Sequence, residues 1–173
     1  MRAIWTVGHS TLSIDDFIAR LGAHDIELVA DVRRYPGSRR VPHFASEPLA
    51  TGLGEAGVAY QWLGDSLGGR RRASPDSPNV GWKHESFRGY ADYLETVEFA
   101  EGLFDLQMLS AGLRTAVMCA EVLWWRCHRR LISDVLTTMG FRVVHIRGDG
   151  GTEVHELRPP ARIVSGRLRY TQG

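Results

Sequence analysis

Five short apolar runs recur along the first 147 residues, and segments with helical periodicity separate them. Each run predicts a strand, and together they cover residues 3–7, 27–32, 58–63, 114–119 and 141–146. Between the runs, helices are predicted over residues 14–21 and 47–56, from residue 88 onward, and over residues 96–111. A further helix is predicted from the arginines near residue 128 to residue 139. This alternation predicts an α/β fold of three layers, in which helices flank a mainly parallel five-stranded sheet with right-handed crossovers.

Capping residues mark where several of these helices begin and end. Ser13 is placed to cap the first helix, Asp16 completes a weaker form of the capping box, and Gly22 ends the helix. Thr96 is placed to cap the fourth helix, and Gly140 closes the last.

The alternation of predicted strands and helices ends at residue 147. Residues 163–170 predict a small hairpin that turns at residues 165–166. A chain of 173 residues with 43% hydrophobic content is long enough for one well-filled core and too short for two ordinary domains. We therefore expect a single domain with a core over 1–147 and a C-terminal extension over 148–173, in which the hairpin is an appendage.

The segment from Gly64 to Lys83 has no apolar periodicity and contains four glycines and two prolines. Long irregular segments inside compact domains are usually functional loops or partly disordered. This segment could close over a ligand as a lid.

Arginine dominates the cationic residues, although the formal net charge is only +1. Lys83 is the one lysine beside twenty arginines, and ten of these arginines fall within residues 33–40, 70–72 and 126–130. None of the three segments contains an acidic residue. Because arginine forms bidentate contacts with phosphate and carboxylate, the clusters predict an anion-binding site, and the expected partner is a phosphate-bearing small molecule or a nucleic acid.

Two cysteines do not form a disulfide scaffold in a chain of this length. The N-terminus lacks the pattern of a signal peptide, and no apolar stretch approaches the length of a membrane span. We expect a cytoplasmic protein with reduced thiols, no membrane partner and no bound cofactor.

Polar segments follow four of the five predicted strands, at residues 8–10, 31–40, 64–72 and 119–130. The carboxyl ends of parallel strands share one edge of a sheet, and ligands of such sheets bind in the crevice beyond that edge. The predicted catalytic residues lie in these segments: Glu121, Cys127, His9, His128, Cys119 and Asp31. The residues expected to bind substrate are Arg33, Arg39, Arg70, Arg126, Arg129, Ser10 and Tyr90.

Cys127 stands beside Arg126, His128 and Arg129 at the start of a predicted helix. Such surroundings lower the pKa of a thiol, so Cys127 is a candidate nucleophile or metal ligand, with a small packed residue as the alternative. Cys119 ends a predicted buried strand, where a structural role is the commoner one.

The remaining candidates also have structural alternatives. Glu121 can act as a general base or a nucleophile, or can pair with a nearby arginine. Asp31 interrupts a buried apolar run and therefore needs a partner, which Arg33 can supply. His9 and His128 are candidates for proton transfer.

Two familiar signatures are missing. The glycines of residues 64–69 lack the Gly-Lys-Ser/Thr ending of a phosphate-cradling P-loop. The region after Cys119 also lacks the cysteine-to-arginine spacing of tyrosine phosphatases, because Trp125 occupies the position of the arginine. Cysteine and histidine from residues 119, 127, 128 and 9 could together bind a metal or haem, although their spacing is not that of a known site.

Seven short pieces together resemble the family known as domain of unknown function 488, from about residue 4 to 160. These pieces are Val7-Gly-His-Ser10, Asp31-Val-Arg33, Pro36-Gly-Ser-Arg39, Arg88-Gly-Tyr90, Met118-Cys-Ala-Glu121, Arg126-Cys-His-Arg129 and His155. The resemblance implies a compact α/β protein of bacterial or archaeal type and carries no settled reaction. It places His9, Asp31, Arg33, Arg39, Cys119, Glu121 and residues 126–129 on motif positions of the family.

These observations predict an enzyme, either a hydrolase or a group transferase, that acts on a nucleotide or a nucleic-acid end. Two other classes stay open. One is a nucleic-acid-binding module without catalysis, in which the arginine segments hold the backbone and Trp124 and Trp125 stack on bases. The other is a metal or haem protein.

Overall fold

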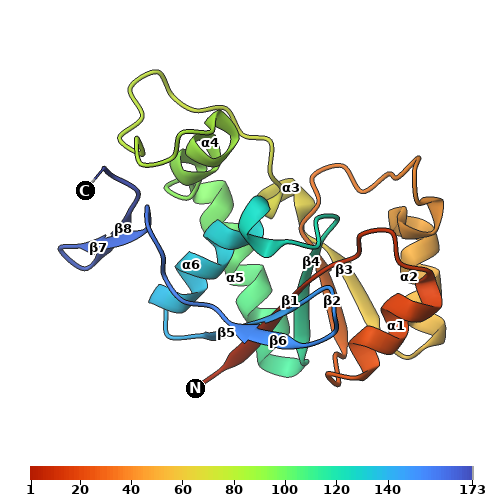
Figure 1. Cartoon of the computed structure of the whole chain (residues 1–173). Helices are drawn as coiled ribbons and strands as arrows, with labels where there is room; N and C mark the ends of the chain where they lie inside the picture. The colour runs from red at the N-terminus through yellow and green to blue at the C-terminus, as the bar shows by residue number, and fades with distance from the viewer. Residues whose placement is uncertain (173) are drawn as a thin grey trace.

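The computed structural model describes residues 1–172, and its central feature is a six-stranded sheet with helices packed on both faces (Figure 1). The strand order is β3-β2-β4-β1-β5-β6. Five strands are parallel: β1 Ala3–Gly8, β2 Leu28–Asp31, β3 Ala59–Trp62, β4 Thr115–Cys119 and β5 Arg142–Ile146. The predicted α/β class and mainly parallel sheet are confirmed. A sixth strand, β6 (Thr152–Val154), pairs antiparallel with β5, and its three residues are too few to show a periodicity.

Five helices begin and end near the predicted positions: α1 Ile14–Gly22, α2 Ser46–Glu55, α4 Glu85–Tyr93, α5 Val97–Gly112 and α6 Arg129–Thr138. The short helix α3 (Gly64–Leu67) was not predicted and lies in the segment expected to be irregular, and the 3₁₀ helices η1 Pro42–Phe44 and η2 Trp124–Arg126 were not predicted either. Both predicted caps are present, because Ser13 Oγ accepts from Asp16 N at 3.1 Å and Thr96 Oγ1 accepts from Phe99 N at 3.2 Å. None of the helices within residues 1–172 has the length and apolar character needed to cross a membrane.

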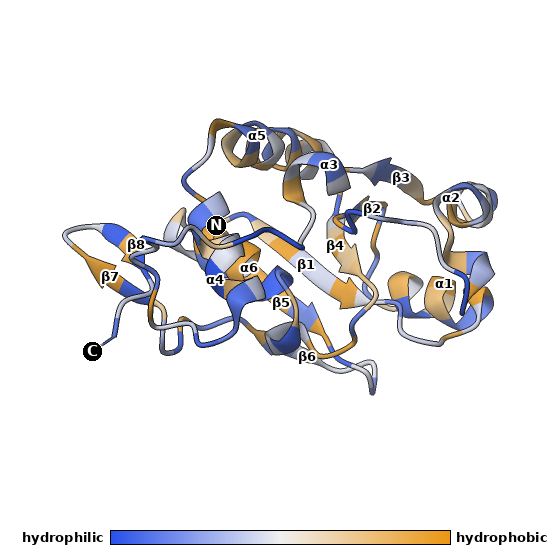
Figure 2. Ribbon diagram, turned by 90° about the horizontal axis from the view of Figure 1, so that it is seen from above, coloured by the Kyte–Doolittle hydropathy of each residue, from blue (hydrophilic) through white to orange (hydrophobic). Residues whose placement is uncertain are grey.

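Two apolar clusters lie on opposite faces of the sheet. Helices α1 and α2 cover one face with Phe17, Leu21, Leu49 and Leu53, and α4, α5 and α6 cover the other. Successive residues of a strand point to opposite faces, so β1 sends alternate residues into each cluster. Figure 2 shows apolar residues along β1 and β4 in the middle of this arrangement.

The sheet has a topological switch point between β2 and β4, which are neighbours in the strand order. From β2 the chain continues through α2 to β3, on one side. From β4 it continues through α6 to β5, on the opposite side. Connections that leave in opposite directions open a crevice at the carboxyl ends of the two strands, and ligands of open α/β sheets usually bind there.

The C-terminal residues form the predicted small hairpin, in which β7 Arg162–Val164 pairs with β8 Arg167–Arg169 as a separate sheet. Ser165 and Gly166 have φ angles of 51° and 75°, which a tight two-residue turn requires. Other parts of residues 148–173 belong to the main body, because β6 extends the central sheet and the Tyr170 side chain is 2% exposed.

The segment between β3 and α4 is fastened to the body of the protein. It begins with the short helix α3, and three of its residues hydrogen-bond to one carboxylate on α4. Ser74 N donates to Asp92 Oδ2 at 2.9 Å, while Ser77 Oγ and Asn79 Nδ2 donate to Oδ1 at 2.6 and 2.7 Å. These bonds fasten residues 74–79 of the segment to α4.

Gly8 ends β1 where the backbone after β4 crosses it. A Cβ atom at residue 8 would lie 2.0 Å from the carbonyl oxygen of Glu121 and 2.7 Å from Cα of Val122. Both atoms belong to backbone, so a side chain there would displace the turn that carries Glu121.

We predict that Gly8→Ala lowers the free energy of unfolding by about 1–3 kcal/mol, because the added methyl group overlaps a backbone carbonyl. The matched control is Gly22→Ala, at an exposed helical position where a Cβ would meet nothing within 4 Å. That change should be neutral or stabilising by up to about 1 kcal/mol. Urea denaturation measures both changes, and equal stabilities for the two variants would contradict the close approach at Gly8.

Candidate functional site

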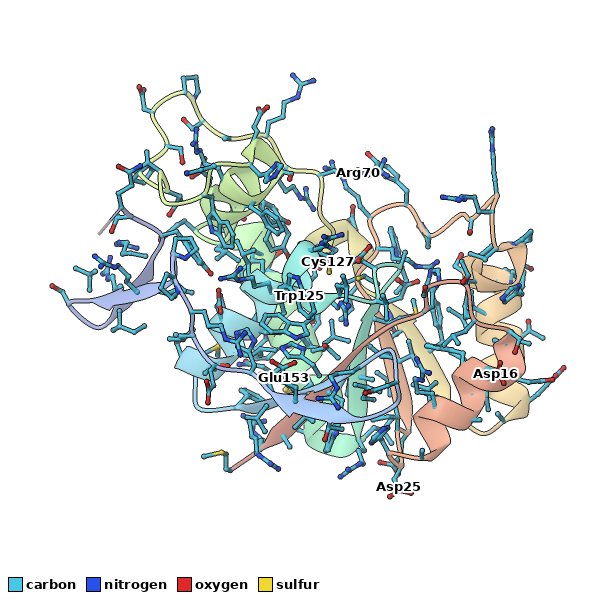
Figure 3. All side chains as sticks on the ribbon, viewed as in Figure 1. Asp16, Asp25, Arg70, Trp125, Cys127 and Glu153 are labelled. Atoms are coloured by element: carbon cyan, nitrogen blue, oxygen red, sulfur yellow. The ribbon has the colours of Figure 1, made fainter. Side chains whose placement is uncertain are left out.

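A cavity of about 370 Å³ lies beyond the carboxyl ends of β2 and β4, beside the amino end of α6. Figure 3 shows Cys127 in this region, with Arg70 above it. The cavity is lined by Arg33, Arg34, Tyr35, Gly69, Arg70, Ser86, Phe87, Tyr90, Cys119, Ala120, Glu121, Arg126, Cys127 and His128. Segments far apart in the sequence therefore meet there, because parallel strands place their following loops on one edge.

The two cysteines form a close pair at the base of the cavity. Cys119 ends β4 and is buried, while Cys127 lies in the turn before α6 and is half-buried. Their Sγ atoms are 3.0 Å apart, and the Nε of Arg129 donates to Cys119 Sγ at 3.0 Å and to Cys127 Sγ at 3.3 Å. The backbone N of Arg129 also donates to Cys127 Sγ at 3.3 Å, so this sulfur occupies the amino end of the helix.

The surroundings separate the pKa values of the two thiols. Burial raises the pKa of Cys119 well above its ordinary value, and its hydrogen bond to Cys127 adds to that effect. Burial also opposes ionisation of Cys127, but the hydrogen bond from Cys119, the charge of Arg129 and the His128 ring outweigh burial and lower the pKa of Cys127 well below its ordinary value. Cys127 therefore carries the thiolate, and Cys119 keeps its proton.

Arg129 is 0% exposed, and none of the ion pairs within residues 1–172 joins it to a carboxylate. Besides the two sulfurs, its guanidinium donates to the carbonyl of Glu121 and, at 3.1 Å, to Thr6 Oγ1. A buried charge needs a counter-charge, and the thiolate of Cys127 is the anion in contact with it.

A chain of buried hydrogen bonds extends from Arg129 to Asp134, which also lies on α6. The Thr6 hydroxyl contacts His145 Nδ1 at 2.6 Å, His145 Nε2 contacts His155 Nδ1 at 2.8 Å, and His155 Nε2 contacts Asp134 Oδ1 at 2.7 Å. Tyr170 closes the chain by donating to Asp134 Oδ2 at 2.8 Å.

One set of tautomers makes the direction of donation uniform along this chain. In it the Asp134 carboxylate accepts from His155 Nε2, His155 Nδ1 accepts from His145 Nε2, and His145 Nδ1 accepts from Thr6, whose oxygen accepts from Arg129. Burial foremost, and then the His155 ring, lower the pKa of His145 to about 2, which keeps the ring neutral as this arrangement requires.

A second buried pair supports the wall of the cavity. Asp31, at the end of β2, is 0% exposed and accepts from Arg33 Nε at 2.9 Å, from Arg33 Nη2 at 2.8 Å and from Tyr60 OH at 2.5 Å. Asp31 is thus the ionic partner of Arg33, as one of the sequence interpretations had it.

His9 lies behind this pair and does not line the cavity. It is 2% exposed and stacks on Phe44 with ring centroids 4.2 Å apart. Its Nδ1 contacts Ser10 O at 2.8 Å and its Nε2 contacts Arg33 Nη1 at 3.3 Å, so both nitrogens are engaged within the protein. Burial foremost, with the nearby Arg33 charge, lowers the pKa of His9 to about 4.

The predicted substrate-binding residues fall into two groups. Arg33, Arg70, Arg126 and Tyr90 line the cavity, although the Tyr90 hydroxyl already donates to Leu67 O at 2.7 Å. Outside the lining are three residues: Arg129, which lies beneath the thiols, Ser10, and the exposed Arg39. Arg70 and Arg126 are exposed, and none of the ion pairs within residues 1–172 includes them.

Glu121 and His128 line the cavity on either side of Cys127 along the chain. Glu121 Oε1 accepts from Leu123 N at 3.3 Å, and Glu121 is the one carboxylate among the lining residues of the described chain. His128 Nε2 donates to Val32 O at 2.9 Å, so Nδ1 is the ring nitrogen at which His128 can exchange a proton.

No group of three or more His, Cys, Asp or Glu side chains within residues 1–172 is arranged to hold a metal ion. His9 and His128, proposed with the cysteines as ligands, are instead bonded to backbone carbonyls. Trp124 is 4% exposed and stacks on His145 at 4.2 Å, whereas Trp125 is 44% exposed. One tryptophan therefore packs the loop, and the other faces solvent.

Several residues around the site were not predicted. Arg34 and Tyr35 line the cavity, and Tyr35 lies beneath the guanidinium groups of Arg34 and Arg70, whose carbons are 5.7 and 5.3 Å from its ring centroid. Asp134 and His145 interrupt apolar positions of α6 and β5. Asp31 was singled out because a polar residue interrupts an apolar pattern, and the same criterion could have identified these two residues.

Comparison with known proteins identifies a family and no characterised relative. A sequence model described as "Domain of unknown function DUF488" matches residues 13–136, which is well over half of the chain. The chain belongs to the DUF488 family. No curated protein and no solved structure matches it significantly. The DUF488 match includes the cysteine pair and Arg129, whereas His145 and His155 of the buried chain lie beyond it.

We predict that Cys127 of this DUF488 protein reacts with iodoacetamide as a thiolate at pH 6, where an ordinary cysteine is almost entirely protonated. Peptide mapping should find the label on Cys127 and not on Cys119, whose pKa is raised. The rate should rise less steeply between pH 6 and 8 than that of an ordinary cysteine, because the pKa of Cys127 is lowered. A rate that rises about tenfold per pH unit through this range would contradict a stabilised thiolate.

The two neutral buried histidines predict a loss of stability in mild acid. The unfolded chain binds protons near pH 6.5, whereas folded His9 and His145 do not bind them until about pH 4 and 2. The free energy of unfolding should therefore fall as pH drops from 6.5 to 5, by up to about 1.4 kcal/mol per pH unit for each histidine. His9→Gln should reduce the slope, and the exposed His84→Gln should not. Equal slopes in His9→Gln and the wild type would contradict a neutral His9.

Proposed function

We propose that this DUF488 protein is an enzyme, a hydrolase or group transferase, in which the thiolate of Cys127 attacks a phosphate-bearing substrate such as a nucleotide or a nucleic-acid end. One observation carries the proposal: a low-pKa cysteine opens into a cavity whose lining includes four arginines and one carboxylate. A surface that only binds anions has little need of an activated thiolate at its centre.

Arg70 and Arg126 are the phosphate ligands in this proposal. Their guanidinium groups are exposed at the cavity and take part in none of the ion pairs within residues 1–172, so binding an anion costs them no existing partner. Arg33 is committed to Asp31 and serves mainly to shape the wall. Arg34 donates to Arg70 O at 2.8 Å and so supports the backbone that carries Arg70.

The Cys127 thiolate attacks phosphorus, the bond from phosphorus to the leaving oxygen breaks, and that oxygen takes a proton from the Glu121 carboxyl group, with His128 as the alternative donor. Water or an acceptor hydroxyl then attacks the phosphorus of the phosphocysteine and gives its proton to the Glu121 carboxylate. The sulfur–phosphorus bond breaks in this step and releases the Cys127 thiolate. His9 takes no part in these steps, because its two ring nitrogens are engaged behind Arg33.

The test is a panel of p-nitrophenyl phosphate, mononucleotides and oligonucleotides phosphorylated at one end, assayed for product and for a phosphorylated protein by intact mass. Cys127→Ser and Cys127→Asp should both abolish turnover, and the aspartate variant keeps a negative charge beside Arg129. Arg70→Gln and Arg126→Gln should each weaken binding about tenfold or more, as expected for a lost charge-assisted hydrogen bond. Arg39→Gln is the matched control and should change nothing, because Arg39 is exposed outside the cavity.

Turnover that survives both Cys127 variants would contradict the proposal. So would oligonucleotide binding that weakens steeply with salt and is unchanged by Cys127→Ser and Glu121→Gln, with no turnover of any substrate. That second result would favour a nucleic-acid-binding module.

A further inference from the structure

We infer that Cys119 and Cys127 form a reversible redox pair, in which Cys127 reacts with a hydroperoxide and Cys119 then closes a disulfide. The inference does not depend on the phosphate chemistry proposed above. It rests on the arrangement of the two sulfurs around Arg129. Three features of that arrangement carry it: the proximity of the sulfurs, their unequal access to solvent, and the buried charge that one of them neutralises.

The first feature is the short distance between the two sulfurs. The two Sγ atoms are 3.0 Å apart in their reduced state, so a small movement of either side chain brings them to bonding distance. They are eight residues apart in sequence, and one ends a strand while the other precedes a helix. The chain between them folds back on itself through η2.

The unequal exposure of the two cysteines determines which of them reacts first. Cys127 is half-buried at the cavity and Cys119 is 4% exposed. The thiolate of Cys127 attacks the distal oxygen of the hydroperoxide, which gives a Cys127 sulfenic acid and an alkoxide or hydroxide that takes a proton from water. The Cys119 thiol then attacks the Cys127 sulfur, a disulfide forms, and water leaves. The two electrons lost by the sulfurs are those gained by the peroxide bond.

The buried charge of Arg129 makes the disulfide easy to reduce. A disulfide is neutral, so oxidation removes the anion that offsets the guanidinium. The chain from Thr6 to Asp134 holds that guanidinium in place, and no carboxylate of residues 1–172 forms an ion pair with it. A protein that stabilises the reduced form of a pair makes its disulfide a stronger oxidant. Low-molecular-weight thiols should therefore reduce this disulfide by exchange.

Oxidation also removes the proposed nucleophile, since both sulfurs are then bonded. The same cavity would be active in its dithiol state and inactive in its disulfide state. The oxidation itself can be measured without any phosphate substrate, so the failure of one proposal would not decide the other.

The experiment treats the reduced full-length chain with one equivalent of hydrogen peroxide, alkylates the remaining thiols and maps the peptides by mass spectrometry. The wild type should lose two hydrogens, show a peptide crosslinked between Cys119 and Cys127, and return to the dithiol in excess reduced glutathione. Cys119→Ser should instead show a sulfenic acid on Cys127 that dimedone traps. If that variant does not fold, the crosslinked peptide of the wild type still decides the question.

The stability of the oxidised protein gives an independent readout. Disulfides usually raise the midpoint of thermal unfolding. Here the oxidised chain should unfold at a lower temperature than the reduced chain, because Arg129 has lost its counter-charge. Two results would overturn the inference: wild-type Cys127 that proceeds to sulfinic acid with Cys119 still free, or a disulfide that raises the midpoint and resists glutathione.

Discussion

The buried guanidinium of Arg129 is the constraint on which the site depends. A full charge at 0% exposure is tolerated only with a counter-charge and satisfied hydrogen bonds, and removing the partner from such a pair typically costs about 3–5 kcal/mol. In this protein the partner is a sulfur of the cysteine pair, so the requirement that keeps the fold stable also ionises Cys127. Stability and reactivity therefore have a common origin in one side chain.

The fold explains how that side chain is held. Thr6 lies at the centre of the sheet on β1, and it connects Arg129 with two histidines and with Asp134 on α6 itself. The chain of donors runs from a cation to an anion through neutral groups, so each member fixes the orientation of the next. The switch point between β2 and β4 then places Cys127 at the crevice, where the arginine loops that follow β2 and β3 also meet.

Apolar periodicity was sufficient to predict the main architecture. Five parallel strands, the caps at Ser13 and Thr96 and the hairpin turn at residues 165–166 each follow from local chemistry, and the structure contains them all. Four of these strands are buried, whereas β3 lies at the edge of the sheet and is mostly exposed. Strand β6 is too short to leave a pattern, and it forms because β5 offers an unpaired edge.

The site was predictable in its residue types and less so in its geometry. Parallel strands bring their following loops to one edge, so the meeting of residues 33, 70, 121 and 127 could be foreseen. Which loop residues line the cavity and which lie buried behind it could not be foreseen, because that depends on tertiary packing. His9 and Arg39 are motif positions of the family, as several cavity residues are, yet one is buried behind Arg33 and the other is exposed elsewhere. Arg129 looked like a ligand for substrate phosphate, and it is instead the ligand of the protein's own thiolate.

The pairing of Arg129 with a Cys127 thiolate is tested most directly by an NMR titration of the chain labelled with ¹³C at the Cβ of cysteine. We expect one cysteine resonance, assigned to Cys127 by its loss in Cys127→Asp, to have the chemical shift of a thiolate at neutral pH, while Cys119 keeps the shift of a thiol. Two thiol resonances at neutral pH that ionise together near the ordinary cysteine pKa would contradict it.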